Sequence, residues 1–184
     1  NGYESKHNLN YWRRGEYVGA GVSASGFLDG RRYTNSFSID EYMNAVIYNK
    51  MPEISVIMSV YNGEDNLAEA IDSVINQTFK DWELIIINDC STDGTAEILD
   101  KYKALDEKII VSPNEVNLKL PSSLNKAIDL ARGKYIARMD ADDICLPDRL
   151  KKQYEFMESN QDIDLSSCRF MTLKNGIVAS GGGG

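Results

Sequence analysis

Three carboxylates crowd into four residues in the segment Asp140-Ala141-Asp142-Asp143, directly after a hydrophobic run that ends at Met139. Like charges this close repel one another, and a bound cation removes that repulsion. Mg²⁺ and Mn²⁺ prefer oxygen ligands and share their remaining positions with phosphates. The segment therefore indicates a divalent-metal site for a phosphorylated substrate. Its alternative interpretation is a solvated acidic loop that leads into a helix N-terminus.

The residues around this segment exclude other metal and catalytic sites. An EF-hand loop needs a glycine at its turn, but Ile144 and Cys145 follow the acidic residues instead. No histidine lies nearby in the sequence to build a zinc site. His7 is the single histidine of the chain, which excludes a Ser-His-Asp triad from the main domain.

Composition is typical of one globular domain, or of one domain with an appendage. The chain has 184 residues, of which 42% are hydrophobic, and no apolar run approaches the length of a membrane span. Residues 1–50 carry a net charge of +1 and the remainder a net charge of −9, which argues against nucleic-acid binding. No signal peptide is visible. Three cysteines without a CxxC spacing indicate a reducing compartment. We expect a cytoplasmic protein, and peripheral attachment at the inner membrane face stays open.

Short β-rich runs alternate with amphipathic helical patterns after Pro52. Helices are expected from Leu67 to about Gln77, from Thr95, from Ser122 or Ser123 to a stop at Gly133, and from Pro147. The alternation predicts an α/β fold with a mainly parallel sheet and helices on both faces. The expected strands are Ile54–Val60, Leu84–Ile87, Ile109–Val111, Tyr135–Met139 and Leu165–Leu173.

Polar residues follow three of these strands. Tyr61 follows the first, Asp89 the second, and Asp140 and Asp142 the fourth. Ligands of parallel α/β sheets bind outside the carboxyl ends of the strands, so these side chains are expected at one binding edge. Neither a GxGxxG fingerprint nor a GxxxxGK[ST] loop is present. A bound nucleotide would therefore be held by carboxylates and metal.

Four ordered blocks resemble the family 2 glycosyltransferases of the GT-A (Rossmann-like) fold. They are ISVIMSVYNGE at 54–64, VINQTFKDW at 74–82, IIINDCSTDGT at 85–95 and GKYIARMDADDICLPDRL at 133–150. Together they cover about residues 53–175. The resemblance implies an enzyme that binds a nucleotide-diphosphate sugar, with a UDP-sugar expected, and transfers the sugar to an acceptor hydroxyl with inversion.

The resemblance also implies roles for residues of the nucleotide pocket. Ser59 and Tyr61 match positions that line the base pocket, and Asp89 matches the carboxylate that accepts a hydrogen bond from the ring nitrogen of a uracil-type base. A loop or capping aspartate is the alternative for Asp89. Lys119 falls near a basic position that contacts the nucleotide, and its alternative is a solvated lysine. Asp93 is expected to stabilise the turn before its helix.

Asp140 and Asp142 match the DxD-type motif of the family. The resemblance implies that Asp142 contacts Mn²⁺ or Mg²⁺ through the nucleotide diphosphate, and that Asp140 lies near the ribose or in the metal shell. Asp143 assists the metal or caps the next helix. Arg149 neutralises phosphate or is an exposed helical arginine. A bridging cation would stabilise the charge that develops on the diphosphate leaving group.

The catalytic base is a departure from the family pattern. In the family this carboxylate lies well after the DxD motif, whereas no acidic residue follows Asp164 here. The sequence reads as a nucleotide-sugar-binding half at residues 53–180, truncated at its C-terminus, followed by a glycine tail at 181–184. The alternative function is a non-catalytic sugar-nucleotide-binding module, or a fragment that lacks the acceptor half.

Residues 1–50 have a different character. The segments HNLNYW at 7–12, EYVGAG at 16–21 and GRRYTN at 30–35 resemble a late segment of radical SAM proteins similar to oxygen-independent coproporphyrinogen III oxidase. The cysteine motif that holds the iron–sulfur cluster of those proteins is absent, so no radical chemistry is expected. A fusion, a truncated gene or a chimera would explain the segment, and an N-terminal extension is the alternative.

Overall fold

The structure is a computed structural model that describes residues 25–28, 31–34, 51–174 and 177–179. The chain divides into two compact units, residues 1–51 and residues 52–184. In the first unit, β1 (Ser25–Leu28) pairs antiparallel with β2 (Arg31–Thr34). Nearly all of the N-terminal segments that resemble radical SAM proteins lie outside the described residues, so that resemblance stays a prediction.

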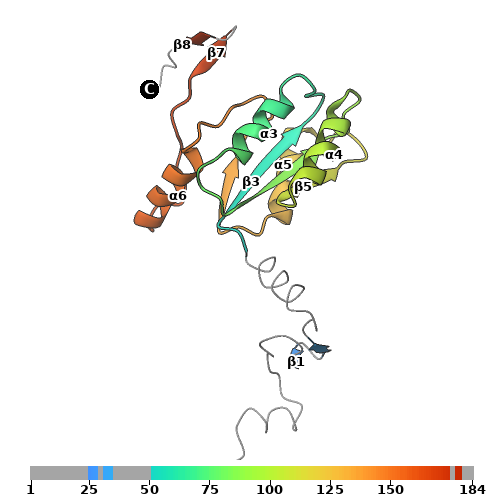
Figure 1. Ribbon diagram of the computed structural model, residues 1–184, viewed down its shortest axis with the longest axis vertical. Coiled ribbons are helices and arrows are strands. Elements are labelled where there is room, and N and C mark those ends of the chain that lie inside the picture. The colour runs from blue at the N-terminus through green and yellow to red at the C-terminus, as the bar shows by residue number, and fades with distance from the viewer. Residues whose placement is uncertain (1–24, 29–30, 35–50, 175–176, 180–184) are drawn as a thin grey trace, which may run out of the picture. The chain divides into compact units, whose positions relative to one another are not determined.

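A four-stranded parallel sheet forms the centre of the second unit (Figure 1). Its order is β5 (Ile109–Pro113), β4 (Trp82–Asn88), β3 (Ile54–Val60) and β6 (Tyr135–Arg138). Four helices alternate with these strands along the chain: α3 (Leu67–Ile75), α4 (Thr95–Leu105), α5 (Lys119–Leu130) and α6 (Arg149–Ser159). A separate antiparallel pair consists of β7 (Thr172–Lys174) and β8 (Ile177–Ala179).

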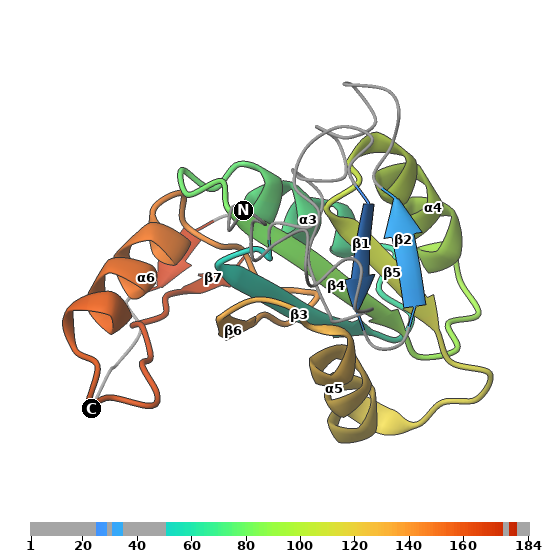
Figure 2. The same cartoon turned by 90° about the horizontal axis from the view of Figure 1, so that it is seen from below.

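Both faces of the sheet are covered, because the two central strands carry apolar side chains on both sides. Figure 2 shows α5 on one side of the sheet and α3 and α4 on the other. On the α5 side, Ile57, Ile85 and Ile87 pack against Ala127. The larger cluster on the opposite side includes Val56, Met58, Leu84 and Ile86 from the strands, with residues of α3, α4 and α6. Full burial of each such side chain contributes about 1.5–3 kcal/mol. The predicted α/β architecture is confirmed.

The last expected strand and the third expected helix differ from the structure. The run Leu165–Leu173 was expected to form a strand, but only Thr172–Lys174 of β7 is extended and paired. Leu165 is 84% exposed and Phe170 69% exposed, so burial does not hold this run against the sheet. Helix α5 begins at Lys119 and ends at Leu130, earlier than the expected start at Ser122 or Ser123 and stop at Gly133.

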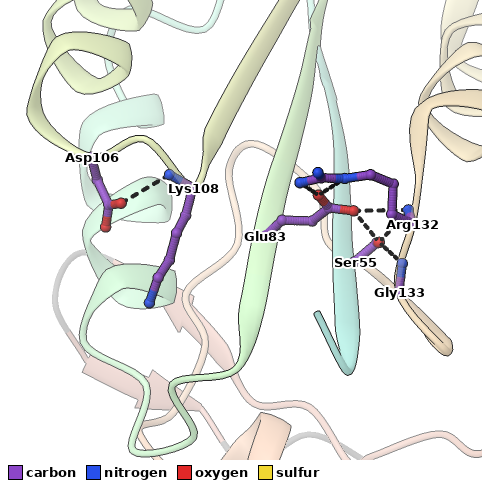
Figure 3. A network of polar contacts seen from close by, with 6 residues as sticks. All are labelled: Ser55, Glu83, Asp106, Lys108, Arg132 and Gly133. Carbon is purple, nitrogen blue, oxygen red and sulfur yellow. Dashed lines mark hydrogen bonds and ion pairs between the residues drawn. The ribbon is translucent and has the colours of Figure 1, made fainter. Parts of the chain in front are cut away.

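A buried polar network fixes the turn between α5 and β6 at the amino-terminal ends of β3 and β4 (Figure 3). The Glu83 carboxylate on β4 is almost fully buried and accepts hydrogen bonds from Ser55 Oγ at 2.7 Å and from the backbone N–H of Arg132 at 2.8 Å. The Arg132 guanidinium donates to the same carboxylate through Nε at 2.9 Å and Nη2 at 2.6 Å. These hydrogen bonds and the ion pair compensate for the free-energy cost of removing the Glu83 charge from water.

Gly133 completes this network by a close approach of two backbones. Its N–H donates to Ser55 Oγ at 2.8 Å. A Cβ at Gly133 would lie 2.5 Å from the backbone nitrogen of Ser55 and 2.8 Å from the carbonyl carbon of Ile54. Backbone atoms at the end of a buried strand do not move aside, so only glycine fits. The expected helix-stop role of Gly133 is replaced by this packing role.

We expect Arg132→Ala to lower the free energy of unfolding by about 3 kcal/mol, because it leaves the Glu83 charge buried without its cation. Lys151→Ala is the matched control, since it removes an exposed lysine from a long helical pair with Glu155 and should cost under about 0.5 kcal/mol. Urea denaturation followed by circular dichroism measures both. Equal losses for the two variants would contradict the role given to the buried network.

Candidate functional site

The carboxyl ends of the parallel strands bring the predicted site residues to one edge of the sheet. Strand β3 ends at Val60 and is followed by Tyr61, and β4 ends at Asn88 and is followed by Asp89. The Asp89 N–H still donates to the Val60 carbonyl at 2.8 Å, so Asp89 stays level with the end of β3. Ser59 lies in β3 and is half-buried, whereas Tyr61 is 52% exposed.

The acidic loop reaches the same edge from β6. Strand β6 pairs with β3 in the register that places Ile57 beside Arg138, and the N–H of Met139 then donates to the Ile57 carbonyl at 3.1 Å. This hydrogen bond continues the pairing one residue past β6, and Asp140 follows as the first residue of the loop. The loop is therefore anchored where it leaves the sheet.

Strained backbone gathers at this edge. Among the described residues, three that are not glycine have positive φ: Asn62 at 51°, Cys90 at 64° and Lys119 at 69°. Asn62 and Cys90 lie two residues past the ends of β3 and β4, and Lys119 opens α5. Left-handed conformations of such residues cost free energy and cluster at functional sites. The backbone thus marks this edge independently of its charges.

The loops after β3 and β4 are joined by hydrogen bonds. The Asn62 side chain accepts the Thr92 N–H at 2.8 Å, and the Asn62 N–H donates to Ser91 Oγ at 3.0 Å. These bonds hold the segment that presents Tyr61.

Asp93 stabilises the turn before α4, as predicted. Its two carboxylate oxygens accept the Thr95 N–H at 3.1 Å and the Glu64 N–H at 3.1 Å. In return the Glu64 carboxylate accepts the Gly94 N–H at 2.6 Å, and Thr95 Oγ1 accepts the Gly63 N–H at 2.9 Å. The pKa of Asp93 lies below its ordinary value, chiefly because of the hydrogen bond with Thr95. The first two loops of the edge form one linked unit.

Asp89 is buried, and its carboxylate accepts hydrogen bonds from within the protein. Its Oδ1 accepts Asn114 Nδ2 and the Leu118 N–H, both at 2.8 Å, and its Oδ2 accepts the Lys119 N–H at 2.9 Å. These backbone donors belong to the start of α5, which a capping carboxylate satisfies. The capping role that the sequence left as an alternative is therefore present.

The hydrogen bonds to Asp89 also set its protonation. Burial favours the neutral acid and raises the pKa, but the donors Asn114, Leu118, Ser123 and Lys119 outweigh it and hold the pKa below its ordinary value. The group is a carboxylate at neutral pH, and can only accept hydrogen bonds there.

The acidic loop contains carboxylates in three different environments. Asp140 is 43% exposed and accepts Arg138 Nη2 at 2.8 Å and 3.1 Å, forming an ion pair. The pKa of Asp143 is raised by burial and by the neighbouring charges of Asp140 and Asp142, against which Arg149 and Arg138 act. Asp142 is exposed, and its carboxylate accepts no hydrogen bond from the residues that the structure describes. Unlike Asp140, Asp142 is therefore free of an internal partner among the described residues and open to a cation.

Arg149 holds the acidic loop by hydrogen bonds. The interpretation of Arg149 as an exposed helical arginine is therefore corrected. Its Nη2 donates to the Arg138 carbonyl at 2.8 Å, its Nη1 contacts Cys145 Sγ at 2.9 Å, and its Nε donates to Gln153 at 3.1 Å. These contacts join both ends of the acidic loop to α6.

The carboxylates alone do not complete a metal site. Within the described ranges, no three Asp, Glu, His or Cys side chains lie close enough together to hold an ion. Asp142 and its neighbours nevertheless supply hard oxygen donors of the type that Mg²⁺ and Mn²⁺ prefer, and these ions commonly bind through one or two carboxylates plus substrate phosphates. The arrangement fits a cation that arrives with a phosphorylated ligand.

The remaining predicted residue, Lys119, is exposed at the start of α5, and only its backbone N–H contacts Asp89. Sequence reasoning missed Asn114, which donates to Asp89, and Ser123 and Lys126, which contact Asn114. One available signal was the position of Asn114 directly after β5, at the same end of the sheet as Tyr61 and Asp89.

We expect Asp89→Asn to lower the free energy of unfolding by about 2 kcal/mol at pH 6, because an amide nitrogen or a weaker acceptor would face three donors. A depressed native pKa stabilises the fold above the unfolded-state pKa, and this stabilisation is lost as pH falls through the native value. The difference between wild type and variant should therefore shrink toward pH 3. Urea titrations at both pH values measure it, with exposed Asp100→Asn as control. A difference independent of pH would contradict the account.

Known proteins resemble this chain over the second unit. Residues 55–175 match the sequence profile of glycosyl transferase family 2. An uncharacterized glycosyltransferase of Methanocaldococcus jannaschii, MJ1057, is 51% identical over 116 residues, which are 62% of this chain and 40% of that protein. The Escherichia coli UDP-Glc:alpha-D-GlcNAc-diphosphoundecaprenol beta-1,3-glucosyltransferase WfaP is 35% identical over 111 residues, 60% of this chain and 43% of WfaP. The chain thus spans less than half the length of these relatives.

The fold has solved counterparts. The crystal structure of Staphylococcus aureus TarS in complex with UDP matches with a TM-score of 0.56 and 31% identity, over 59% of this chain and 33% of the TarS chain. A TarS complex with UDP-GlcNAc matches equally well by TM-score. The described helices are too short or too polar to cross a membrane. Because the family match covers well over half of its residues, this chain belongs to glycosyl transferase family 2.

Proposed function

We propose that residues 52–174 form the donor-binding part of a glycosyltransferase that takes a UDP-sugar together with Mn²⁺ or Mg²⁺ and serves transfer to an acceptor hydroxyl with inversion. The observation that carries this proposal is the convergence of exposed Tyr61, ionised Asp89 and the acidic loop at one edge of a parallel sheet. The TarS complexes with UDP and UDP-GlcNAc, and the UDP-Glc donor in the name of WfaP, support a UDP-sugar.

The diphosphate end of the donor would lie at the acidic loop. Asp142 would bind the metal directly, and Asp140 would lie near the ribose or the metal shell. The cation stabilises negative charge on the leaving diphosphate without proton transfer. Asp140 is available for this role once its exposed ion pair with Arg138 opens, because such surface pairs contribute about 0–1 kcal/mol.

The base end would lie between Tyr61 and Asp89, beside Ser59. The exposed ring of Tyr61 can stack on a base. Asp89 is only 2% exposed, so a ring N–H reaches its Oδ2 when the segment before Lys119 moves aside. The left-handed conformation of Lys119 is strained, which lowers the cost of such a movement. The exposed Lys119 side chain would then contact the nucleotide from this segment.

We expect Mn²⁺ to strengthen UDP binding to the wild-type chain, and Asp142→Ala to remove at least about tenfold of that gain, because the bridging ion loses its protein ligand. Isothermal titration with UDP, in the presence of Mn²⁺ or of a chelator, measures the effect. With chelator the variant and the wild type should bind UDP alike.

Asp162→Ala is the matched control, since it removes an exposed carboxylate outside the candidate site. Its Mn²⁺ gain should equal that of the wild type. An Asp142→Ala variant with an undiminished Mn²⁺ gain would reject Asp142 as the metal ligand, and a wild type that does not bind UDP with Mn²⁺ would reject the proposed function.

A further inference from the structure

The Asn114 side chain lies between an anion and a cation. Its Nδ2 donates to Asp89 Oδ1 at 2.8 Å and to Ser123 Oγ at 2.9 Å, and its Oδ1 accepts Lys126 Nζ at 2.9 Å. Lys126 Nζ is held in place by a second bond, to the Pro113 carbonyl at 2.7 Å. Asn114 is 8% exposed and Ser123 is fully buried. Both amide N–H groups and the amide oxygen are therefore used.

This arrangement allows only one orientation of the Asn114 amide. A flip would turn the amide oxygen toward the Asp89 carboxylate and the NH₂ group toward the Lys126 ammonium. An acceptor would then face an acceptor, and a donor would face a donor. The ammonium also polarises the amide and strengthens its bond to the carboxylate, because linked hydrogen bonds reinforce one another. Lys126 thus acts on Asp89 through Asn114.

The two oxygens of Asp89 differ in how firmly they are held. Oδ1 accepts the buried Asn114 side chain, which is fixed at its far end, and the backbone N–H of Leu118, whereas Oδ2 accepts the backbone N–H of the strained residue Lys119. Oδ2 is therefore the oxygen that can exchange its partner for a ligand N–H while Oδ1 keeps the carboxylate in place. Lys126 is joined to this carboxylate through Asn114.

We infer that Lys126 and Asn114 are positioning residues that fix the Asp89 carboxylate for recognition of a uracil-type base. The inference rests on the proposed function and deepens it, because it assigns base selectivity to a Lys126–Asn114–Asp89 relay. The ring nitrogen at position 3 is a donor in uracil and an acceptor in cytosine. A fixed carboxylate accepts the first and repels the second, whereas a carboxylate free to turn distinguishes them less.

The test is the ratio of the affinities for UDP and CDP, both titrated with Mn²⁺ on the full chain. The wild type should prefer UDP at least about tenfold, as expected for one hydrogen bond to a charged group. Lys126→Met keeps the length of the side chain but removes the ammonium, and should lower the ratio at least about threefold. Asn114→Ala should lower it further, and Lys126→Arg should keep it near the wild-type value.

Lys101→Met on the exposed surface of α4 is the control for loss of one lysine charge, and its ratio should equal that of the wild type. A purely structural role of Lys126 would weaken UDP and CDP binding in parallel, so an unchanged ratio in Lys126→Met would overturn the inference. If the wild type binds UDP without preference over CDP, the relay has no function in base recognition. If it binds neither nucleotide, the proposed function itself fails.

Discussion

The position of the acidic loop depends on the buried Glu83 carboxylate at the opposite end of the sheet. Strand β6 pairs with β3 over only four residues, from Tyr135 to Arg138. Such a short strand has little intrinsic register, and a slip of one residue would exchange its two faces. Glu83, Ser55 and Arg132 hold the turn before β6, and Gly133 lets the two backbones touch. This anchor sets the register of β6 against β3, and so where the acidic loop leaves the sheet.

The two ends of the proposed donor site are built in opposite ways. The proposed base end is a set of satisfied hydrogen bonds in which the buried Asp89 carboxylate accepts Asn114 and the first backbone donors of α5. The diphosphate end leaves the Asp142 carboxylate exposed and without an internal donor. A carboxylate with all its hydrogen bonds made is held in a fixed orientation. Crowded carboxylates repel one another, and binding a cation between them lowers the free energy. In the proposed function, the first end recognises the base and the second end binds a cation together with the diphosphate.

The sequence was sufficient for the features that follow from strong local patterns. Strands β3 and β4 are buried on both faces, so their Ile-rich runs predicted them, and the parallel arrangement then placed Tyr61, Asp89 and Asp140 at one edge. The run Leu165–Leu173 also contains apolar residues, but Leu165, Phe170 and Met171 are exposed, and hydrophobicity alone could not reveal that. The start of α5 was missed because its first donors are satisfied by Asp89, about thirty residues away in sequence. Lys126 and Asn114 were missed for the same reason: their importance comes from tertiary contacts, and no motif includes them.

The central claim is that a nucleotide diphosphate completes a metal site that the acidic loop only begins. Paramagnetic broadening of amide signals by substoichiometric Mn²⁺, recorded on the ¹⁵N-labelled chain with and without UDP, tests it most directly. The account predicts strong broadening at Asp140–Asp143 when UDP is present and weak broadening there without it, because one or two carboxylates hold such ions poorly in the absence of phosphate. Broadening at this loop that is independent of UDP, or that centres elsewhere in the chain, would contradict it.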